Sequence, residues 1–334
     1  MDRTGDQHGD RKRRRGPGGK PQGPYGKSEG QHGQRSGYQG KPPGPHPKPR
    51  FGPKPKPPGK GKGGQAAAHQ GGAQPPPKGA HPPVGTSWEH VAQWYDRLVG
   101  EVGSDYHRNV LLPAAMGMLN PRKGQRVMDV CCGQGVLSRM IGATGAQVLG
   151  VDISESLIAS ARARGGGPNV RYEIADARQL GPIADGSFDS AVCLMAVHDL
   201  DNLDAAMASM SAALRPGGTA VLIMMHPCFR IPRQSSWGWD EQRKIQYRRL
   251  DRYASEMTVP IAAHPGADPS QHTLFYHRPL QSYLNALGKA GLAVTLCKEL
   301  LSHRRSEPGG RSRAENRARD EFPVFIALMA KKLG

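Results

Sequence analysis

The sequence has few cysteines, and none of them is spaced as metal ligands usually are. Its five cysteines form no C-x-x-C pair, the spacing on which most structural zinc sites are built. Cys131 and Cys132 are adjacent, and the other three lie far apart in the sequence. The cysteines therefore predict small buried thiols in a reducing compartment, and no metal site is expected.

Long hydrophobic runs are also missing. No apolar stretch approaches the ~20 residues that cross a bilayer. The N-terminus has no apolar segment of the kind that a secretory signal contains. We therefore expect neither a membrane span nor an export signal, and we place the protein in the cytoplasm.

The first 85 residues are poor in acids and in residues that could form a core. They contain 17 Lys and Arg but four acids, so +13 of the chain's formal charge of +18 lies there. Such a basic, Pro- and Gly-rich composition cannot offset its chain entropy, and we expect a disordered tail over 1–85. The tail would bind RNA or another polyanion weakly through counterion release. Whether that binding has a function, or the tail only increases solubility, stays open at this point.

The remaining residues, 86–334, are enough for one α/β domain, which we expect to be organised around a glycine turn. An apolar run over 127–130 contains Asp129, and Gly133 and Gly135 follow it. Apolar residues then recur at helical spacing from Val136. Glycine allows unusual backbone angles and a close approach of a ligand, and a helix start offers free N–H groups. The pattern predicts a strand, a turn and a helix that hold a polar ligand.

Further strands follow at the spacing of a nucleotide-binding sheet. Residues 148–152 end in Asp152, about 20 residues after the turn opens, where α/β nucleotide sites place a carboxylate that binds ribose. Residues 170–177 contain Asp176, and residues 187–195 form another apolar run. A dinucleotide site would need a third glycine where Ser138 stands, so we do not favour a nicotinamide cofactor.

These features resemble the class I S-adenosylmethionine-dependent methyltransferases, in particular the small-molecule branch related to ubiquinone and menaquinone C-methyltransferases. The resemblance covers roughly residues 88–332 and is strongest over 126–225. It implies an α/β fold with a Rossmann-like, seven-stranded sheet of six parallel strands and one antiparallel strand, with helices on both faces. It also implies that S-adenosyl-L-methionine is the cofactor.

The resemblance further assigns residues to the cofactor. Asp129 and the two glycines would lie against its methionine part, Asp152 would bind the ribose hydroxyls, and Asp176 with Ala177 would meet the adenine. The family usually has Gly where Cys131 stands, so this chain departs from the pattern but keeps a small residue. The full set is Asp129, Cys131, Gly133, Gln134, Gly135, Asp152, Ile153, Asp176, Ala177 and Met195.

The segment 196–204 follows the fourth strand, at the edge of the sheet where α/β proteins bind ligands. Its acids would suit a metal, but no carboxylate follows the next strand, so we favour helix capping by Asp201 or Asn202. His198 is a candidate base, because the resemblance places a His here toward the methyl group or the substrate. The alternative is a wall residue. Tyr95, in the helix before the sheet, is a second catalytic candidate.

Residues 228–278 exceed the common core and are rich in aromatic residues and arginine. An insertion here emerges beside the cofactor, so we expect a substrate lid that suits a planar or anionic acceptor. The alternative is that its tryptophans only pack the lid onto the core. A loop over 302–313 carries more arginines, which either bind an anion or are solvated. The residues expected at the acceptor are Tyr106, His226, Trp237, Trp239, Tyr276 and Arg278.

We therefore expect an enzyme that transfers a methyl group to a small, aromatic or anionic acceptor at carbon or oxygen. No Asn-Pro-Pro-Tyr follows the fourth strand, which argues against methylation of adenine or glutamine amino groups. Two alternatives remain open. One is an RNA- or ribosome-directed methyltransferase guided by the tail. The other is a noncatalytic nucleic-acid-binding protein whose methyltransferase domain senses the cofactor.

Overall fold

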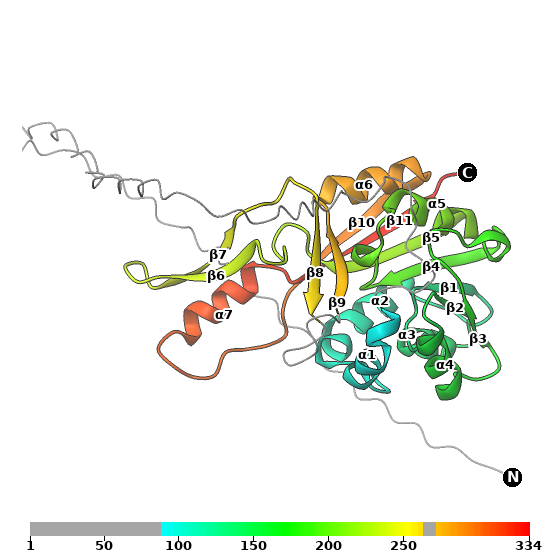
Figure 1. The fold of residues 1–334 in the computed structure, drawn as a ribbon, viewed down its shortest axis with the longest axis horizontal. Coiled ribbons are helices and arrows are strands. Elements are labelled where there is room, and N and C mark those ends of the chain that lie inside the picture. Colours follow the sequence, from blue (N-terminus) through cyan, green and yellow to red (C-terminus); the bar gives the residue numbers. More distant parts are fainter. Residues whose placement is uncertain (1–87, 263–271) are drawn as a thin grey trace, which may run out of the picture. The chain divides into compact units, whose positions relative to one another are not determined.

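A seven-stranded mixed sheet forms the centre of the computed structural model, which describes residues 88–262 and 272–334 (Figure 1). The strand order is β10-β11-β5-β4-β1-β2-β3. Strand β11 is antiparallel to both of its neighbours, and the other pairs are parallel. This confirms the predicted fold class, whereas the predicted tail over 1–85 lies outside the described residues. The strands are β1 (Arg126–Val130), β2 (Gln147–Asp152), β3 (Val170–Ile174), β4 (Phe188–Leu194), β5 (Leu214–Met225), β10 (Leu292–Leu300) and β11 (Phe325–Lys332).

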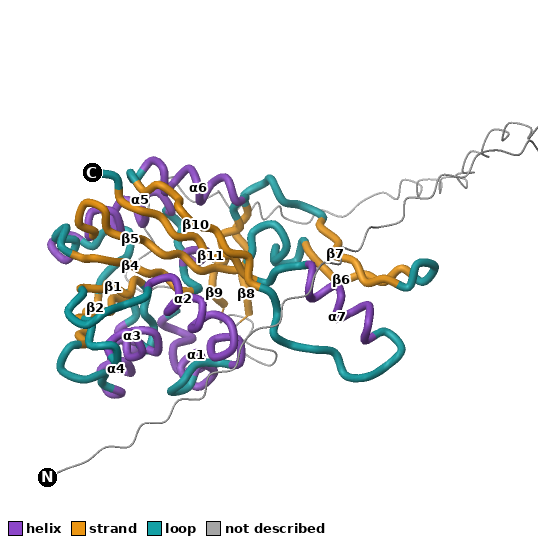
Figure 2. The backbone as a smooth tube through the Cα atoms, turned by 180° about the vertical axis from the view of Figure 1, so that it is seen from behind, coloured by secondary structure: helices purple, strands orange, loops and turns teal. Residues whose placement is uncertain are grey.

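Helices cover both faces of the sheet because its central strands are apolar on both sides, as buried parallel strands usually are (Figures 1 and 2). Helices α5 (Leu203–Ala213) and α6 (Leu280–Lys289) pack on the face that includes Met128. Helices α2 (Leu112–Leu119) and α3 (Val136–Gly142) pack on the face that includes Val127. The alternation of neighbouring residues between the two cores fixes the register of each strand.

The helical segments before the sheet are tied to helix α4 (Glu155–Arg164). They comprise a 3₁₀ turn (Glu89–Val91), helix α1 (Ala92–Val99) and a π-helical turn (His107–Leu111) that leads into α2. Asp96 of α1 forms a two-pronged ion pair with Arg164 of α4, with N–O distances of 2.5 and 2.9 Å. Ser154 caps α4, because its hydroxyl accepts a hydrogen bond from the backbone N–H of Leu157 at 3.2 Å.

Two antiparallel hairpins occupy most of the segment between β5 and α6 that the structure describes. They are β6 (Ser235–Asp240) with β7 (Ile245–Leu250), and β8 (Met257–Ala262) with β9 (His272–His277). Neither hairpin joins the central sheet. Helix α7 (Ser312–Glu321), which the sequence did not predict, packs against β7 (Figure 1). Within residues 88–262 and 272–334, no helix combines the length and apolar character needed to cross a membrane.

Candidate functional site

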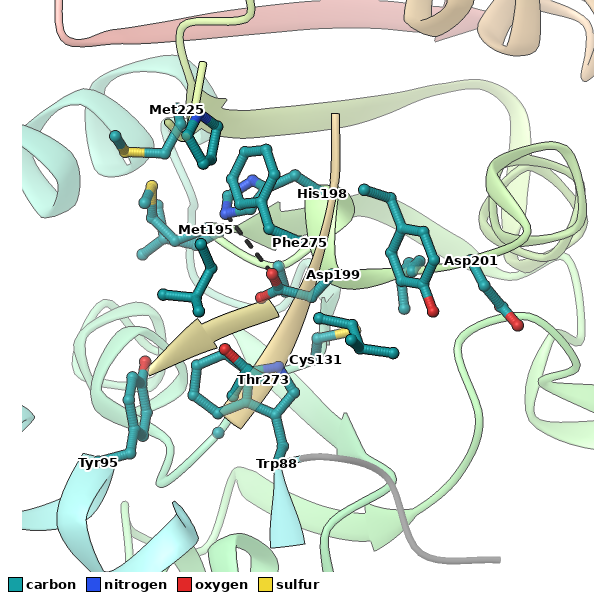
Figure 3. Close-up of a pocket in the computed structure, with 18 of the residues that line it drawn as sticks. Trp88, Tyr95, Cys131, Met195, His198, Asp199, Asp201, Met225, Thr273 and Phe275 are labelled. Carbon is teal, nitrogen blue, oxygen red and sulfur yellow. Dashed lines mark ion pairs between the residues drawn. The ribbon is translucent and has the colours of Figure 1, made fainter. Parts of the chain in front are cut away.

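A cavity of about 600 Å³ opens at the carboxyl-terminal edge of the parallel strands (Figure 3). Its walls come from the turn after β1, the ends of β2, β4 and β5, the segment after β3, and the two hairpins. This is the edge at which open α/β sheets bind ligands, and the volume is in the range of small-molecule sites. The predicted site residues that line it are Tyr95, Cys131, Gly133, Asp152, Ile153, Asp176, Ala177, Met195, His198 and Tyr276.

The turn after β1 has the left-handed backbone that its glycines permit. Gly133 and Gly135 have φ angles of 56° and 81°. Cys131 also has a positive φ, 59°, where most residues are strained, and its side chain lines the cavity. A Cβ atom on Gly135 would lie 2.5 Å from the hydroxyl of Tyr172, so this position has no room for a side chain. Gly133, which has no side chain, lines the cavity, so the turn presents backbone there.

Asp152 lies at the end of β2 and faces both the turn and the cavity. One oxygen of its carboxylate accepts a hydrogen bond from the Gly133 N–H, and the other accepts one from the Ser154 N–H, each at 2.9 Å. Burial raises the pKa of this carboxyl group above its ordinary value. The carboxylate is thus held in one orientation by two backbone groups before any ligand arrives.

Asp129, Gln134 and Gly135 support the turn from behind and do not line the cavity. The Asp129 carboxylate accepts a hydrogen bond from the Ser138 hydroxyl at 2.6 Å. Burial, with a contribution from the charge of Asp152, raises the pKa of Asp129 to about 7. The Gln134 amide donates to the Gly100 carbonyl at the end of α1. These residues fix the shape of the turn.

Beyond β3, Asp176 and Ala177 line the end of the cavity that the sequence assigned to adenine. Arg178 joins Asp176 to Asp201, with N–O distances of 2.7 Å to each carboxylate. The hydrogen bond to Asp176 raises the pKa of Arg178, which keeps its charge. Asn202 accepts a hydrogen bond from the Ala205 N–H and caps α5, which confirms the predicted capping.

His198 and Asp199 lie in a short 3₁₀ turn (Val197–Asp199) directly after β4 (Figure 3). The Nε2 atom of His198 is 3.9 Å from an Asp199 carboxylate oxygen. Its Nδ1 atom is buried and has no hydrogen-bond partner among the described residues. Burial, and secondarily the charge of Arg278, lowers the pKa of His198 to about 3, so its imidazole is neutral at pH 7. Burial has the opposite effect on the Asp199 carboxyl group and raises its pKa.

The ring of Tyr95 contacts that of Trp88 edge to face, with the centroids 5.2 Å apart, and both side chains line the cavity (Figure 3). Burial raises the pKa of the Tyr95 hydroxyl, so it remains a hydrogen-bond donor at neutral pH. Sequence reasoning singled out Tyr95 but missed Trp88 and Asp199. Asp199 could have been found because it directly follows His198, whereas the place of Trp88 depends on how α1 packs.

Five of the six residues predicted for the acceptor lie outside the cavity wall. Tyr106 shares a hydrogen bond with Ser302 at 2.9 Å, and His226 shares one with Glu299 at the same distance. Arg278 donates to the carbonyls of Leu200 and Asp201, at 2.9 and 2.6 Å. Through these bonds Arg278 holds the segment that carries His198.

Trp237 and Trp239 lie on hairpin β6–β7, and each is covered by an arginine. The Arg248 guanidinium is 5.1 Å from the Trp237 ring, and that of Arg311 is 4.6 Å from the Trp239 ring. Three of the four arginines of the 302–313 segment are paired with acids of the chain. Their ion pairs are Arg304–Asp105, Arg305–Asp320 and Arg311–Glu241.

The hairpins bring other residues to the cavity. Phe275 of β9 places its ring 4.7 Å from the His198 ring. Sequence reasoning did not select these residues, because four of them lie in the turns before β6 and 273–275 are consecutive on β9, so alternation along a strand does not mark them. They are Arg230, Ile231, Pro232, Arg233, Ser235, Arg248, Ile261, Thr273, Leu274 and Phe275.

Comparison with known proteins agrees with this arrangement. Residues 128–222 match a family described as a methyltransferase domain. The chain is similar to a demethylmenaquinone methyltransferase of Staphylococcus aureus (strain MRSA252), with 30% identity over 141 residues, or 41% of this chain. That alignment covers 57% of the relative, so the chain spans little more than half its length.

Two solved structures are also similar. An S-adenosylmethionine-dependent methyltransferase from Mesorhizobium loti is 30% identical, with a TM-score of 0.52 over 66% of this chain and 96% of that one. A Listeria monocytogenes protein assigned to the same activity is 23% identical, with a TM-score of 0.53 over 66% and 97% of the two chains. At that identity, the second similarity concerns the fold alone.

Proposed function

The chain belongs to the class I S-adenosylmethionine-dependent methyltransferases. We propose that it methylates a small molecule bound in the part of the cavity that the cofactor leaves free. Its cofactor is S-adenosylmethionine. We assign the acceptor atom to carbon or oxygen and the acceptor to aromatic or anionic molecules. A quinone-type ring, as in the name of the Staphylococcus relative, is one such acceptor. The five free thiols favour a reducing setting, and we place the enzyme in the cytoplasm.

The observation that carries this proposal is the contact between Gly133 and Asp152 at the cavity wall. The turn presents bare backbone, and the Asp152 carboxylate is already oriented by two N–H groups. We propose that Asp152 binds the ribose hydroxyls, that the turn lies against the methionine part, and that Asp176 with Ala177 meets the adenine. When bound, the cofactor supplies an electrophilic methyl group on a sulfonium, and the bond from methyl to sulfur breaks as the bond to the acceptor forms.

We propose that His198 receives the proton that a hydroxyl or acidic carbon loses on methylation. The neutral ring has a buried Nδ1 atom without a hydrogen-bond partner among the described residues. Because burial holds the pKa of the ring at about 3, this transfer requires a negative charge beside the imidazolium that it forms. An ionised Asp199, with a carboxylate oxygen 3.9 Å from Nε2, would supply that charge, because the imidazolium and the carboxylate favour each other's ionised form and so oppose the effect of burial on both pKa values. The buried setting excludes water and keeps the pair close to the acceptor.

The cofactor assignment is tested by calorimetric titration of the full chain with S-adenosylhomocysteine. Asp152→Asn should weaken binding about tenfold or more, because it removes hydrogen bonds to a charged group. Glu173→Gln, an exposed acid on β3, should bind as the wild type does. Equal affinity in both variants would remove Asp152 from the cofactor site, and no binding by the wild type would overturn the proposed function.

The proton-transfer assignment is tested with labelled methyl groups and a metabolite extract as the source of acceptor. His198→Asn and Asp199→Asn should each lower turnover by about 10²-fold, the contribution of a general base, while S-adenosylhomocysteine affinity holds. Full turnover in His198→Asn would leave His198 as a wall residue. Dependence of the labelling on the basic tail would instead favour an RNA-directed enzyme.

A further inference from the structure

The end of the cavity formed by the hairpin segment carries arginines that no acid of the described residues pairs. Arg230 precedes the first hairpin, and Arg248 lies on β7; both line the cavity. Neither forms an ion pair with a carboxylate among residues 88–262 and 272–334. By contrast, Arg304, Arg305 and Arg311 each form an ion pair with an acid of the chain.

Arg248 is fixed in position by uncharged partners. Its Nε donates to the Phe229 carbonyl at 2.9 Å, and one terminal nitrogen donates to the Ser235 hydroxyl at 2.7 Å. The guanidinium also lies over the Trp237 ring. These contacts orient the planar group and leave its charge uncompensated, which is the arrangement of a prepared anion site.

A third guanidinium increases the positive potential at this end. Arg319 of α7 has a buried Nε atom without a hydrogen-bond partner among the described residues. Its charge reaches Arg230, whose pKa is lowered first by burial and then by Arg319. Burial likewise lowers the pKa of Arg248, and the charge of Arg230 lowers it further. Like charges gathered in a partly buried place cost free energy, which a bound anion would offset.

The charges are divided along the cavity. The carboxylates in its wall belong to Asp152, Asp176, Asp199 and Asp201, all at the sheet edge. The described residues that the hairpin segment contributes to the wall include no acid, and the apolar side chains of Ile231, Leu274 and Phe275 are among them. One end therefore suits the cofactor, and the other suits an apolar body that bears a negative charge.

We propose that the methyl acceptor is a small organic anion whose carboxylate or phosphate group is bound by Arg230 and Arg248. This inference rests on the proposed function and narrows its acceptor class. The oxyanion anchors one end of the acceptor, and Phe275 contacts its apolar body next to His198. The anchored group then sets which atom faces the methyl donor, because positioning is the main source of rate in such a transfer.

The test uses calorimetric titration of the full chain saturated with S-adenosylhomocysteine. The probes are benzoate, phenyl phosphate and the uncharged benzamide, so that the arms separate carboxylate from phosphate. We expect the better of the two anions to bind at least about tenfold more tightly than benzamide, as expected for charge-assisted hydrogen bonds. Anion binding no tighter than that of benzamide would overturn the proposal.

Variants show whether the named arginines are responsible. Arg248→Met and Arg230→Met should each weaken binding of the preferred anion about tenfold or more, and Arg248→Lys should restore part of it. The matched control is Arg249→Met, because Arg249 is the next residue on β7 but is exposed and paired with Asp251 at 2.7 Å. An anion preference that survives in both Met variants would contradict the assignment.

Two further readouts keep the outcomes separate. Melting followed by circular dichroism shows that each variant is folded, and S-adenosylhomocysteine affinity should stay at the wild-type value. If the wild type does not bind S-adenosylhomocysteine, the proposed function is wrong. If it binds S-adenosylhomocysteine but shows no preference for the anions, only the oxyanion site is wrong. A labelled methylation product should also be retained on an anion exchanger, and an uncharged product would contradict the proposal.

Discussion

Asp129 gives the cofactor turn a dependence on pH through its carboxyl group. The residue is 1% exposed, and burial raises its pKa from 3.8 to about 7. In the unfolded chain the same group ionises near its ordinary value. Between these two values the folded state binds more protons than the unfolded state. The free energy of unfolding that this residue contributes therefore falls as the pH rises from about 4 to about 7.

Replacing Asp129 with Asn should remove this dependence. The free energy of unfolding of the variant minus that of the wild type should be larger at pH 8 than at pH 5. The increase should be on the order of 1 kcal/mol for each pKa unit by which folding shifts Asp129. Urea unfolding without cofactor at both pH values measures the difference. Asp189→Asn is a control of opposite sign. Partial burial raises the pKa of Asp189, but the hydrogen bond from Arg215 and other contacts lower it overall. A pH-independent effect of Asp129→Asn would contradict the argument.

Single residues were predictable from the sequence where their role is local. Gly133 and Gly135 could be placed in the turn, and Asp152 at the end of a strand, because both positions follow directly from spacing along the chain. Phe275 and Arg248 could not, since their inward direction depends on the pairing within each hairpin. The separation of His226 from the cavity likewise depends on Glu299, 73 residues away in sequence.

The unit formed by β1, the glycine turn and α3 requires glycine at 135 for two reasons, its positive φ and the lack of space for a side chain. Gly135→Ala should lower the free energy of unfolding by several kcal/mol, because the new Cβ would lie 2.5 Å from the Tyr172 hydroxyl and the left-handed backbone would also be strained. It should weaken S-adenosylhomocysteine binding as well, because the helix start moves. Thermal melting and calorimetry measure both effects.

Gly124→Ala is the matched control for this prediction. Gly124 has nearly the same φ, 82°, and nothing lies within 4 Å of the Cβ that it would gain. The variant should lose about 1–2 kcal/mol from backbone strain alone and retain cofactor affinity. Equal losses in the two variants would show that the contact with Tyr172 does not restrict Gly135.

Two aromatic side chains of the hairpins, Phe275 and Trp239, should differ in their influence on the acceptor. Phe275→Ala should raise the half-saturation concentration of the acceptor roughly tenfold, because the ring lies against His198 in the cavity. Trp239→Ala should leave that value unchanged and lower the melting temperature, because Trp239 packs under Arg311 outside the cavity wall. Steady-state kinetics and melting compare them, and a kinetic effect confined to Trp239→Ala would reverse the assignment.

At the level of elements, the sheet was predictable, but the segment between β5 and α6 was not. The central strands are apolar runs bounded by turns, and the order of the sheet follows from the family. The sequence predicted a lid over 228–278 without identifying its strands. Alternation is weak in strands such as Ile245–Leu250, in which all six residues are partly or fully exposed.

At the scale of the whole molecule, residues 1–85 differ from residues 86–334 most clearly in net charge. Residues 1–85 carry a net +13, and the rest of the chain carries +5. Deleting 1–85 should leave methylation of a small acceptor unchanged. If the full chain retains RNA in a salt-dependent way, as its basic residues predict, the deletion should abolish that retention. Labelled turnover and filter binding at two salt concentrations measure these effects. Turnover that falls with the deletion would instead support guidance by the tail.

Because the hairpins are separate from the central sheet, the segment between β5 and α6 could be replaced as a unit. Strand β5 ends at Met225 and α6 begins at Leu280, and none of the strands that the structure describes between them hydrogen-bonds with the seven-stranded sheet. A designer could therefore graft a foreign specificity cassette between these points without rebuilding the cofactor turn. The graft would have to retain Arg278, whose bonds to Leu200 and Asp201 connect the cassette to the chemical centre. A domain built in this way can acquire new acceptors while its methyl donor stays the same.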